Sequence, residues 1–262
     1  MAIDAARMAG ALLTDRVRTG SEHEVSSKST PTDLVSEADR ASERAIRDLL
    51  HTRRPEDGFV GEEGGSERGT SGLEWVVDPL DGTVNFLFGI PQWCVSVAVR
   101  DDAGTLAGAI WDPAREELFT ATRAGPASAA REGATRELAG GRTAAAHSSG
   151  ADDGLAGAMV ATGLAYDARV REAQAAVLAR LIPRVRDIRR FGSAALDLAW
   201  TAAGRYDAYY ERTVKQWDIA AGALVCERAG LSVIELPERE GLPWGILAAR
   251  PGLAEALLEI VG

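Results

Sequence analysis

Residues 74–83 of the chain read Glu74-Trp75-Val76-Val77-Asp78-Pro79-Leu80-Asp81-Gly82-Thr83. The apolar start of this stretch predicts a short buried strand. Pro79 has no N–H to donate, so the strand cannot continue beyond Asp78 as a regular ladder. Gly82 permits a close backbone approach, and the apolar residues after Thr83 predict that a helix begins there. A strand end that delivers two carboxylates beside helix-terminal N–H groups suits a metal ion and a phosphate together.

Asp78 and Asp81 also resemble other patterns. As an isolated pair they are equally typical of an Asx-turn at a strand end. In the phosphatases whose nucleophilic aspartate lies in D-x-D-G-T the two acids are two positions apart, whereas here they are three apart and point differently. An EF-hand loop is excluded because the stretch lacks acids at the alternating early positions and the late glutamate. The choice between a turn and a metal site therefore depends on the rest of the chain.

The chain has 262 residues, of which 46% are hydrophobic, and a net charge of −10. This length and composition predict one large domain, or two closely packed halves, with a core rather than a disordered chain. The negative charge disfavours a nucleic-acid partner, since binding to a phosphate backbone needs a basic surface. A small phosphate ester stays open as a ligand, because a bound divalent metal would reverse the local sign of charge.

The cysteines, the histidines and the lengths of the apolar runs argue against several further classes of protein and site. Cys94 and Cys226 lie in apolar contexts far apart in the chain, which predicts buried free thiols in a reducing cytoplasm. No apolar run reaches about 18 residues and no charged-then-apolar leader is present, so we expect neither a membrane span nor a signal peptide. The scattered His23, His51 and His147 argue against a histidine metal site or a Ser-His-Asp triad.

The first half of the chain contains both helices and strands. Apolar residues at helical spacing predict an N-terminal helix over residues 3–17 and a second helix over residues 41–50 that ends before Pro55. Asp39 falls at the start of the second helix, where an acid also complements the helix dipole. Strands are predicted at residues 95–99, 106–111 and 117–121.

Residues 123–154 are rich in alanine, glycine, serine and arginine and show little periodicity. We expect an irregular connection there, and the boundary between two halves at about 1–140 and about 141–262. Beyond it the sequence predicts strands at 158–161, 188–191, 206–210, 231–236 and 246–249 and helices at 170–181, 194–203, 217–230 and 251–261. This order favours a layered α+β fold, and the absence of G-x-G-x-x-G and G-x-x-x-x-G-K-[ST] disfavours dinucleotide and P-loop sites.

Four carboxylates lie at junctions between loops and regular elements: Glu62, Asp78, Asp81 and Asp218. Hard divalent cations take oxygen ligands, and two-metal phosphoester sites need several carboxylates. The Leu80 carbonyl joins the set because the proline-disrupted turn leaves it without a ladder partner. Simpler explanations stay open, since Glu62 fits a solvated loop and Asp218 fits the first turn of a helix. Sequence spacing alone does not bring the four acids together.

Six blocks of sequence resemble the inositol monophosphatase family, within the metal-dependent, lithium-sensitive phosphatases. They follow the family's order and rough spacing over nearly the whole chain, which makes the resemblance specific. The blocks are Lys28…Asp33-Leu34-Val35-Ser36-x-x-Asp39, Gly61-Glu62-Glu63, Trp75-x-x-Asp78-Pro79-Leu80-Asp81-Gly82-Thr83-x-Asn85-Phe86, Gly192-Ser193-Ala194-Ala195, Ala208-Tyr209-Tyr210-Glu211 and Trp217-Asp218-x-Ala220-x-Gly222.

The resemblance implies a layered αβαβα sandwich of the sugar-phosphatase type, formed as a single phosphatase domain over residues 1–262 with an N-terminal metal-binding half. It also implies Mg²⁺ as the cofactor, with two or three ions in each active site. Glu62, Asp78 and the Leu80 carbonyl would hold one ion. Asp78, Asp81 and Asp218 would hold a second, with Asp78 bridging the two.

The family's reaction is an in-line attack of water on phosphorus without a covalent enzyme intermediate. By resemblance, Thr83 and Asp39 would orient and deprotonate a metal-activated water, and Glu62 is counted with them as catalytic. The N–H groups of Gly82 and Thr83 would receive phosphate oxygens. Glu211 would accept hydrogen bonds from hydroxyl groups of the substrate, and Lys28 matches a lysine near the metal loop. The full set expected to contact substrate is Asp81, Gly82, Thr83, Gly192, Ser193, Ala194, Glu211 and Asp218.

The implied function is hydrolysis of inositol monophosphate or a related polyol or sugar phosphate, carried out by a homodimer without nucleic-acid or membrane partners. Fructose-1,6-bisphosphatase or 3′-phosphoadenosine nucleotidase activity is an alternative, because the metal blocks are shared across the superfamily. A regulatory binding protein on the same fold is the non-enzyme alternative.

Two places depart from the family pattern. A glycine- and aromatic-containing hairpin with an Asn-Gly turn often follows the strand at 117–121, but residues 123–133 read Arg-Ala-Gly-Pro-Ala-Ser-Ala-Ala-Arg-Glu-Gly. Gln216 precedes Trp217 where a proline often stands. The first departure places the local hairpin in doubt.

Overall fold

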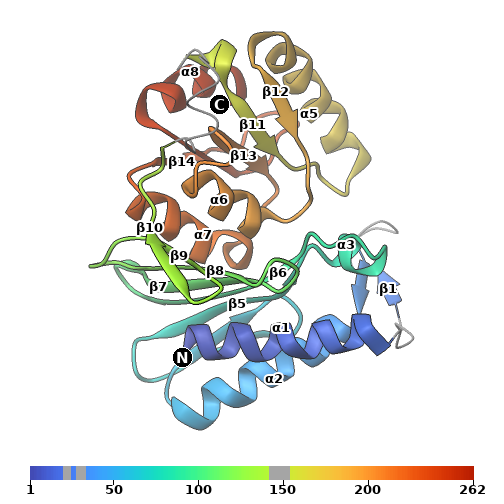
Figure 1. The fold of residues 1–262 in the computed structure, drawn as a ribbon. Coiled ribbons are helices and arrows are strands. Elements are labelled where there is room, and N and C mark those ends of the chain that lie inside the picture. The colour runs from blue at the N-terminus through green and yellow to red at the C-terminus, as the bar shows by residue number, and fades with distance from the viewer. Residues whose placement is uncertain (20–24, 28–33, 142–153) are drawn as a thin grey trace.

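The computed structural model describes residues 1–19, 25–27, 34–141 and 154–262 and consists of five stacked layers (Figure 1). Helices α1 (Ala2–Thr19) and α2 (Glu37–Arg53) form the first layer and cover one face of a large sheet. Helices α6 (Ala194–Ala202) and α7 (Gln216–Arg228) lie between that sheet and a smaller one, and α5 (Ala168–Leu181) and α8 (Pro251–Val261) form the last layer. The predicted α+β fold with αβαβα layers is confirmed.

The first sheet has eight strands in the order β10-β9-β8-β7-β6-β5-β3-β4. Its pairs are antiparallel except for β3 with β5, which run parallel. The strands are β3 (Gly58–Gly61), β4 (Gly65–Glu67), β5 (Glu74–Asp81), β6 (Cys94–Asp101), β7 (Gly104–Asp112), β8 (Glu117–Thr122), β9 (Ser128–Arg131) and β10 (Ala134–Glu137).

Strand β5 carries the irregularity that Pro79 predicts. Its ladder with β6 runs from the pair Glu74–Arg100 to the pair Asp78–Ser96, then shifts register and resumes at Asp81–Cys94. Helix α3 (Thr83–Leu87) follows at once, so the helix begins at Thr83 as expected. The interrupted ladder turns the end of a buried strand into a loop that presents two acids.

The second sheet has five strands in the order β12-β11-β13-β15-β14. Strand β11 pairs in parallel with β12 and β13, and the remaining pairs are antiparallel. The strands are β11 (Met159–Thr162), β12 (Asp187–Arg189), β13 (Ala208–Arg212), β14 (Ser232–Leu236) and β15 (Gly245–Ala249). A two-stranded sheet of β1 (Val25–Ser27) and β2 (Leu34–Ser36), and the 3₁₀ turns Leu155–Gly157 and Ile182–Arg184, complete the described elements.

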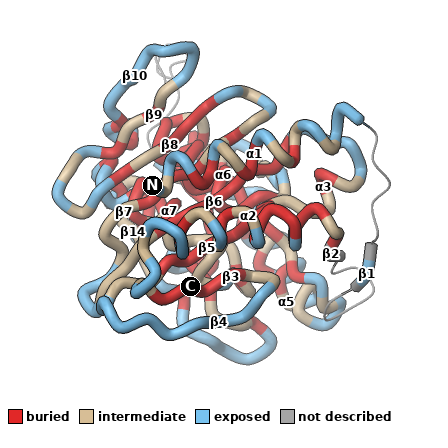
Figure 2. Tube along the Cα trace, turned by 90° about the horizontal axis from the view of Figure 1, so that it is seen from below, coloured by how far each residue is buried: buried red, intermediate tan, exposed pale blue. Residues whose placement is uncertain are grey.

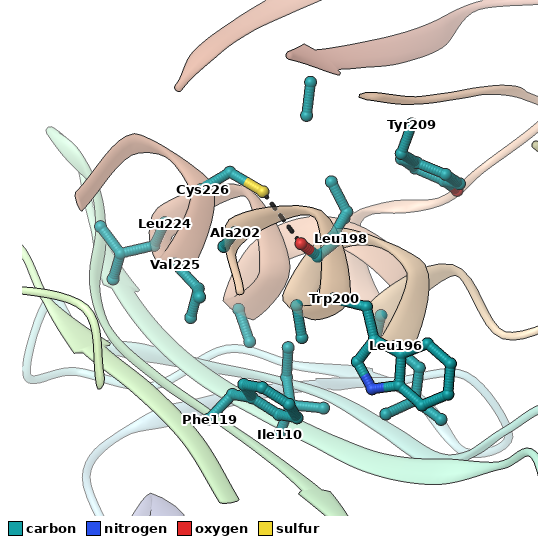
Figure 3. Packing of buried hydrophobic residues seen from close by; sticks show 14 of the residues in the cluster. Ile110, Phe119, Leu196, Leu198, Trp200, Ala202, Tyr209, Leu224, Val225 and Cys226 are labelled. Atoms are coloured by element: carbon teal, nitrogen blue, oxygen red, sulfur yellow. Dashed lines mark hydrogen bonds between the residues drawn. The ribbon is translucent and has the colours of Figure 1, made fainter. Parts of the chain in front are cut away.

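The largest core cluster lies where α6 and α7 pack on the first sheet (Figure 3). Phe119 and Leu198 are fully buried there, and the Cys226 thiol donates to the Leu198 carbonyl at 3.2 Å. Contact between β7 and α7 is especially close, because an ideal Cβ on Gly108 would lie 2.8 Å from the Cα of Ala221. Both cysteines are buried and free, as predicted.

The prediction of an irregular connection over residues 123–154 is wrong for its first part. Strands β9 and β10 form a hairpin that pairs with β8, and its exposed tip projects at the edge of the molecule (Figure 2). Glu132 and Gly133 both have positive φ, 52° and 79°, which is the backbone geometry of a tight hairpin turn. The Glu-Gly pair was the available signal, and the small residues around it hid the alternation of a strand.

In the described ranges no helix has the length and apolar character needed to cross a bilayer.

Candidate active site

A cavity of about 530 Å³ opens at the end of β5 and collects most of the residues that the sequence analysis selected. Its wall comes from the loops after β3, β5 and β11, the loop before α6, the end of β13 and the start of α7. The selected residues that line it are Glu62, Asp78, Leu80, Asp81, Gly82, Thr83, Gly192, Ala194, Glu211 and Asp218. Asp39 and Ser193 touch these residues from behind the wall.

Asp78 is the most enclosed acid of the cavity, with 2% of its surface exposed. Burial, and then the negative charges of Glu62, Asp81 and Asp218, raise the pKa of Asp78 well above its usual value. One hydrogen bond opposes this shift, from the Leu80 backbone N–H to Asp78 Oδ1 at 3.0 Å. The acids are therefore close enough to repel one another.

Asp81 connects the end of β5 to the start of α6. Its Oδ2 accepts hydrogen bonds from the Ser193 hydroxyl at 2.6 Å and the Ala195 N–H at 2.7 Å, and its Oδ1 accepts from the Ala194 N–H at 3.2 Å. Burial raises the pKa of Asp81, and these hydrogen bonds oppose the shift. Ser193 is thus buried behind Asp81, with 1% exposure, rather than placed at the cavity wall.

Asp218 lies in the first turn of α7, where its Oδ2 accepts from the Lys215 backbone N–H at 2.6 Å. Enclosure of the carboxylate, and then the charges of Glu62 and Asp81, raise the pKa of Asp218 well above its usual value. In the parts of the chain that the structure describes, no three Asp, Glu, His or Cys side chains converge closely enough to hold a metal ion as they are oriented. Local N–H groups hold these carboxylates instead.

The donor set nevertheless fits a hard divalent cation. Four carboxylates from three separate segments face one cavity, and burial, followed by the charges of the neighbouring acids, raises the pKa of Asp78 and Asp218 well above the usual value. Buried acids that repel one another are stabilised by a bound cation. Because every donor is an oxygen, Mg²⁺ suits the set better than zinc or copper.

Thr83 and Asp39 form the pair that the sequence analysis expected. The Thr83 hydroxyl lies 2.8 Å from Asp39 Oδ1 and 3.1 Å from the Leu80 carbonyl, and its single proton can serve one of them at a time. Asp39 is fully buried, and its Oδ2 accepts from the backbone N–H and the hydroxyl of Ser36. The carboxylate is thereby fixed with one oxygen toward the cavity.

Gly82 makes the turn between β5 and α3 possible. Its φ is +97°, and an ideal Cβ would lie 2.8 Å from the Gln92 carbonyl oxygen. A side chain at this position would strain the backbone and push the loop away from β6. The reception of phosphate oxygens by the N–H groups of Gly82 and Thr83 stays a prediction.

Glu211 lies near the end of β13 and lines the same cavity as the acids of β5. The Tyr209 hydroxyl donates to Glu211 Oε2 at 2.8 Å. Burial raises the pKa of Glu211 to about 7, against that hydrogen bond and the positive charge of Arg190. Glu211 is therefore divided between its carboxylate and carboxylic acid forms near neutral pH, and the carboxylate form is the hydrogen-bond acceptor.

Several lining residues were not predicted from the sequence: Leu164, Ala165, Tyr166, Asp167, Arg190 and Lys215. Arg190 stands two positions before Gly192, and Lys215 three positions before Asp218, so nearness to a recognised block was the available signal. Lys28 and Asp33 lie outside the described residues.

Comparisons with known proteins agree with this geometry. Residues 1–261 of the chain match the model of the family described as "Inositol monophosphatase family". The chain is 44% identical over 242 residues to the inositol-1-monophosphatase of Mycobacterium leprae, covering 89% of this chain and 80% of that protein. It is 37% identical over 262 residues to Nus factor SuhB of Escherichia coli, covering 98% and 93%. The crystal structure of extragenic suppressor protein suhB from Bartonella henselae superposes with a TM-score of 0.86 at 34% identity, over 99% of this chain and 96% of that one.

Proposed function

The chain belongs to the inositol monophosphatase family and is a phosphatase, and from this premise we propose that it hydrolyses inositol monophosphate or a related polyol or sugar phosphate with Mg²⁺. One observation supports this proposal above the others. Glu62, Asp78, Asp81 and Asp218 face one cavity as mutually repelling acids, beside the hydrogen-bonded Thr83–Asp39 pair.

The residues that would hold Mg²⁺ are Glu62, Asp78 and the Leu80 carbonyl for one ion and Asp78, Asp81 and Asp218 for another. Bound Mg²⁺ supplies positive charge that offsets the phosphate and lowers the pKa of water. The number of ions and the sharing of Asp78 are part of the proposal.

The Thr83–Asp39 pair handles the proton of the attacking water. Thr83 Oγ1 accepts a hydrogen bond from the water and passes its own proton toward Asp39 Oδ1, 2.8 Å away. Asp39 keeps its second oxygen engaged by Ser36, which fixes the orientation of the acceptor. Glu211 accepts a hydrogen bond from a hydroxyl of the alcohol part.

The proposal is tested by phosphate release from inositol 1-phosphate, fructose 1,6-bisphosphate and adenosine 3′,5′-bisphosphate. We expect turnover of the inositol ester with Mg²⁺, loss with EDTA and recovery on adding Mg²⁺ back. Release from none of the three substrates at any Mg²⁺ concentration would refute the proposal. A preference for either bisphosphate would support the corresponding alternative activity.

A homodimer is part of the same proposal. Phe88, Ile90 and Phe191 are 73%, 48% and 38% exposed. The Ile90 N–H and the Phe191 carbonyl both bond to Asn85, so the segments that carry these partly exposed apolar residues are neighbours. Light scattering should give the mass of a dimer, and Phe88→Ser should shift the equilibrium toward monomer.

A regulatory binding role is a second candidate, because one relative at 37% identity is named Nus factor SuhB. It predicts a stoichiometric macromolecular partner that Asp78→Asn still binds. A partner whose binding is lost together with catalysis would instead tie the interaction to the active site.

A further inference from the structure

Arg190 lies at the mouth of the cavity and has no role in the chemistry described so far. It belongs to the loop between β12 and α6 and lines the cavity wall. Its guanidinium lies over Gly192, because an ideal Cβ there would be 2.5 Å from Arg190 Nη1. It makes no hydrogen bond or ion pair with another described side chain, whereas the neighbouring Arg189 pairs with Asp187 at 2.6 Å. The donors of Arg190 are therefore available to a ligand.

Glu211 lines the same cavity as Arg190 and carries the opposite charge when ionised. Its carboxylate packs directly against Gly163, where an ideal Cβ would lie within 2.0 Å of both Glu211 oxygens. Tyr209 holds Oε2, so Oε1 has no hydrogen-bond donor among the described residues. The positive charge of Arg190 also lowers the pKa of Glu211, which places the two groups within electrostatic reach. The same cavity thus offers a hydrogen-bond acceptor at Glu211 and a charged donor at Arg190.

The charges around Arg190 indicate which kind of group it meets. Asp197 in α6 is 1% exposed and has the Tyr206 hydroxyl as a neighbouring hydrogen-bonding group. Arg190 is the cation whose charge lowers the pKa of Asp197, against the larger effect of burial. The acids that line the cavity outnumber its lining cations, Arg190 and Lys215, so a second phosphate would meet a net negative surface. A neutral hydroxyl group fits better.

Hydrogen bonds hold the loop that carries Arg190 to the end of β5 and to α3, where the phosphate is proposed to bind. Asn85 in α3 donates from Nδ2 to the Phe191 carbonyl at 2.6 Å and to the Gln92 carbonyl at 2.7 Å. On the other side of Gly192, Asp81 accepts the N–H groups of Ala194 and Ala195. The backbone beside Arg190 is therefore held at a fixed place relative to the acids that would bind the phosphate.

We propose that Arg190 is a specificity-determining residue that acts with Glu211 to recognise two neighbouring hydroxyl groups on the alcohol part of the substrate. Glu211 accepts a hydrogen bond from one hydroxyl, and the Arg190 guanidinium donates to the oxygen of the next. This assignment rests on the proposed function and narrows it to phosphate esters of vicinal diols. Bisphosphates are disfavoured.

The test compares inositol 1-phosphate with 4-nitrophenyl phosphate, which has no hydroxyl group, in wild type, Arg190→Gln, Arg190→Lys and Arg189→Gln. We expect Arg190→Gln to lower the ratio of kcat/KM for the inositol ester to that for the nitrophenyl ester by about tenfold or more, mainly through KM. Arg190→Lys should recover part of the ratio, since it keeps a charged donor. The control Arg189→Gln should leave the ratio within about twofold.

Other outcomes would overturn the assignment. Equal losses on both esters, or no loss on either, would remove Arg190 from substrate recognition, provided that thermal melting shows a folded variant. A larger loss on fructose 1,6-bisphosphate than on inositol 1-phosphate would assign Arg190 to a second phosphate. If wild type hydrolyses neither ester with Mg²⁺, the proposed function fails and this assignment fails with it, a result distinct from an unchanged ratio in an active enzyme.

Discussion

The two ends of strand β5 carry acids in different surroundings. Glu74, at its first residue, is paired with an arginine, whereas Asp78 and Asp81, near its last residue, are not. Glu74 accepts from Arg100 Nε at 2.8 Å, and the adjacent Trp75 donates to Asp57, which Arg54 also binds. Asp78 and Asp81 have no ion pair with any described lysine or arginine, although both are more deeply buried than Glu74. Each end borders a hollow, of about 480 Å³ and 530 Å³.

The pKa values of the two ends move in opposite directions. Near Glu74, a hydrogen bond from Arg123 lowers the pKa of Asp101, and bonds from Arg54, Ser71 and Trp75 lower that of Asp57 against the desolvation of its burial. At the other end burial and like charges raise the pKa of Asp78. Acids paired within the chain serve structure, whereas buried acids that repel one another are typical of functional sites.

The largest expected difference between the two ends is catalytic. Asp78→Asn removes the charge of a proposed metal ligand at constant volume and should lower kcat/KM roughly a thousandfold, since metal charge stabilisation is worth several kcal/mol. Glu74→Gln, the matched change at the other end, should stay within about twofold. Steady-state kinetics with saturating Mg²⁺ measure both, and circular dichroism checks the fold. A native Asp78→Asn protein with near wild-type turnover would show that the ligand assignment is wrong.

A hydroxyl at each end gives the next comparison. Thr83 bonds to Asp39 at 2.8 Å and Ser71 bonds to Asp57 at 2.7 Å, so the local geometry is alike. Thr83→Ala should lower kcat by roughly a hundredfold with little change in KM, because the hydroxyl acts on the water. Ser71→Ala should leave kcat unaffected. Equal kcat values in the two variants would reject the catalytic role of Thr83.

Stability of the metal-free protein should depend on pH with opposite signs at the two ends. The folded pKa of Asp78 and Asp218 lies above the unfolded value, so their contribution is present below about pH 4 and is lost as pH rises through the folded pKa. Between pH 7 and 5 the melting temperature in EDTA should therefore rise on acidification. The lowered pKa of Asp57 and Asp101 makes their contribution present above about pH 4 and lost below it.

Two controls separate these contributions in thermal melts. Asp78→Asn should flatten the rise between pH 7 and 5, because one of the two buried carboxyl groups that take up a proton in this range is gone. Saturating Mg²⁺ should also flatten or reverse it, since protons and metal compete for the same oxygens. A metal-free wild type whose melting temperature falls steadily from pH 7 to 5 would contradict the raised pKa values.

The smallest effect is expected for the ion pair itself. Glu74 and Arg100 are 30% and 37% exposed, and partly exposed pairs contribute about 0–1 kcal/mol. Arg100→Gln should therefore change the free energy of unfolding by no more than about 1 kcal/mol, with activity unchanged. Urea titration measures the first and phosphate release the second. A large loss of activity would link this end of β5 to the site.

Much of the architecture could be predicted from sequence because local signals agree with the final fold. Apolar periodicity located most of the elements, and Pro79 located the break in β5. The hairpin of β9 and β10 was missed, since a strand made of alanine and serine lacks the alternation that marks a half-buried strand. The expected strand at 188–191 ends at Arg189, because the Phe191 carbonyl bonds to Asn85 instead of a neighbouring strand.

Only those site residues that belong to the six sequence blocks could be predicted from the sequence. The acids were selected by residue type and order, but their actual partners, such as the α6 N–H groups that hold Asp81, are contacts between segments more than a hundred residues apart. The sequence signal for Arg190 is only its nearness to Gly192, and its position over that glycine is a feature of the folded structure. Long-range hydrogen bonds and close approaches are the part that sequence patterns do not encode.

Gly108 determines how closely helix α7 packs on the first sheet. It lets α7 rest on β7 without an intervening side chain, and α7 delivers Asp218 from its first turn. A single methyl group at position 108 would lift that helix and carry the carboxylate with it, so a substitution deep in the sheet would register as an active-site defect. Substitutions that impair turnover without lining the cavity are therefore expected along the contact between β7 and α7.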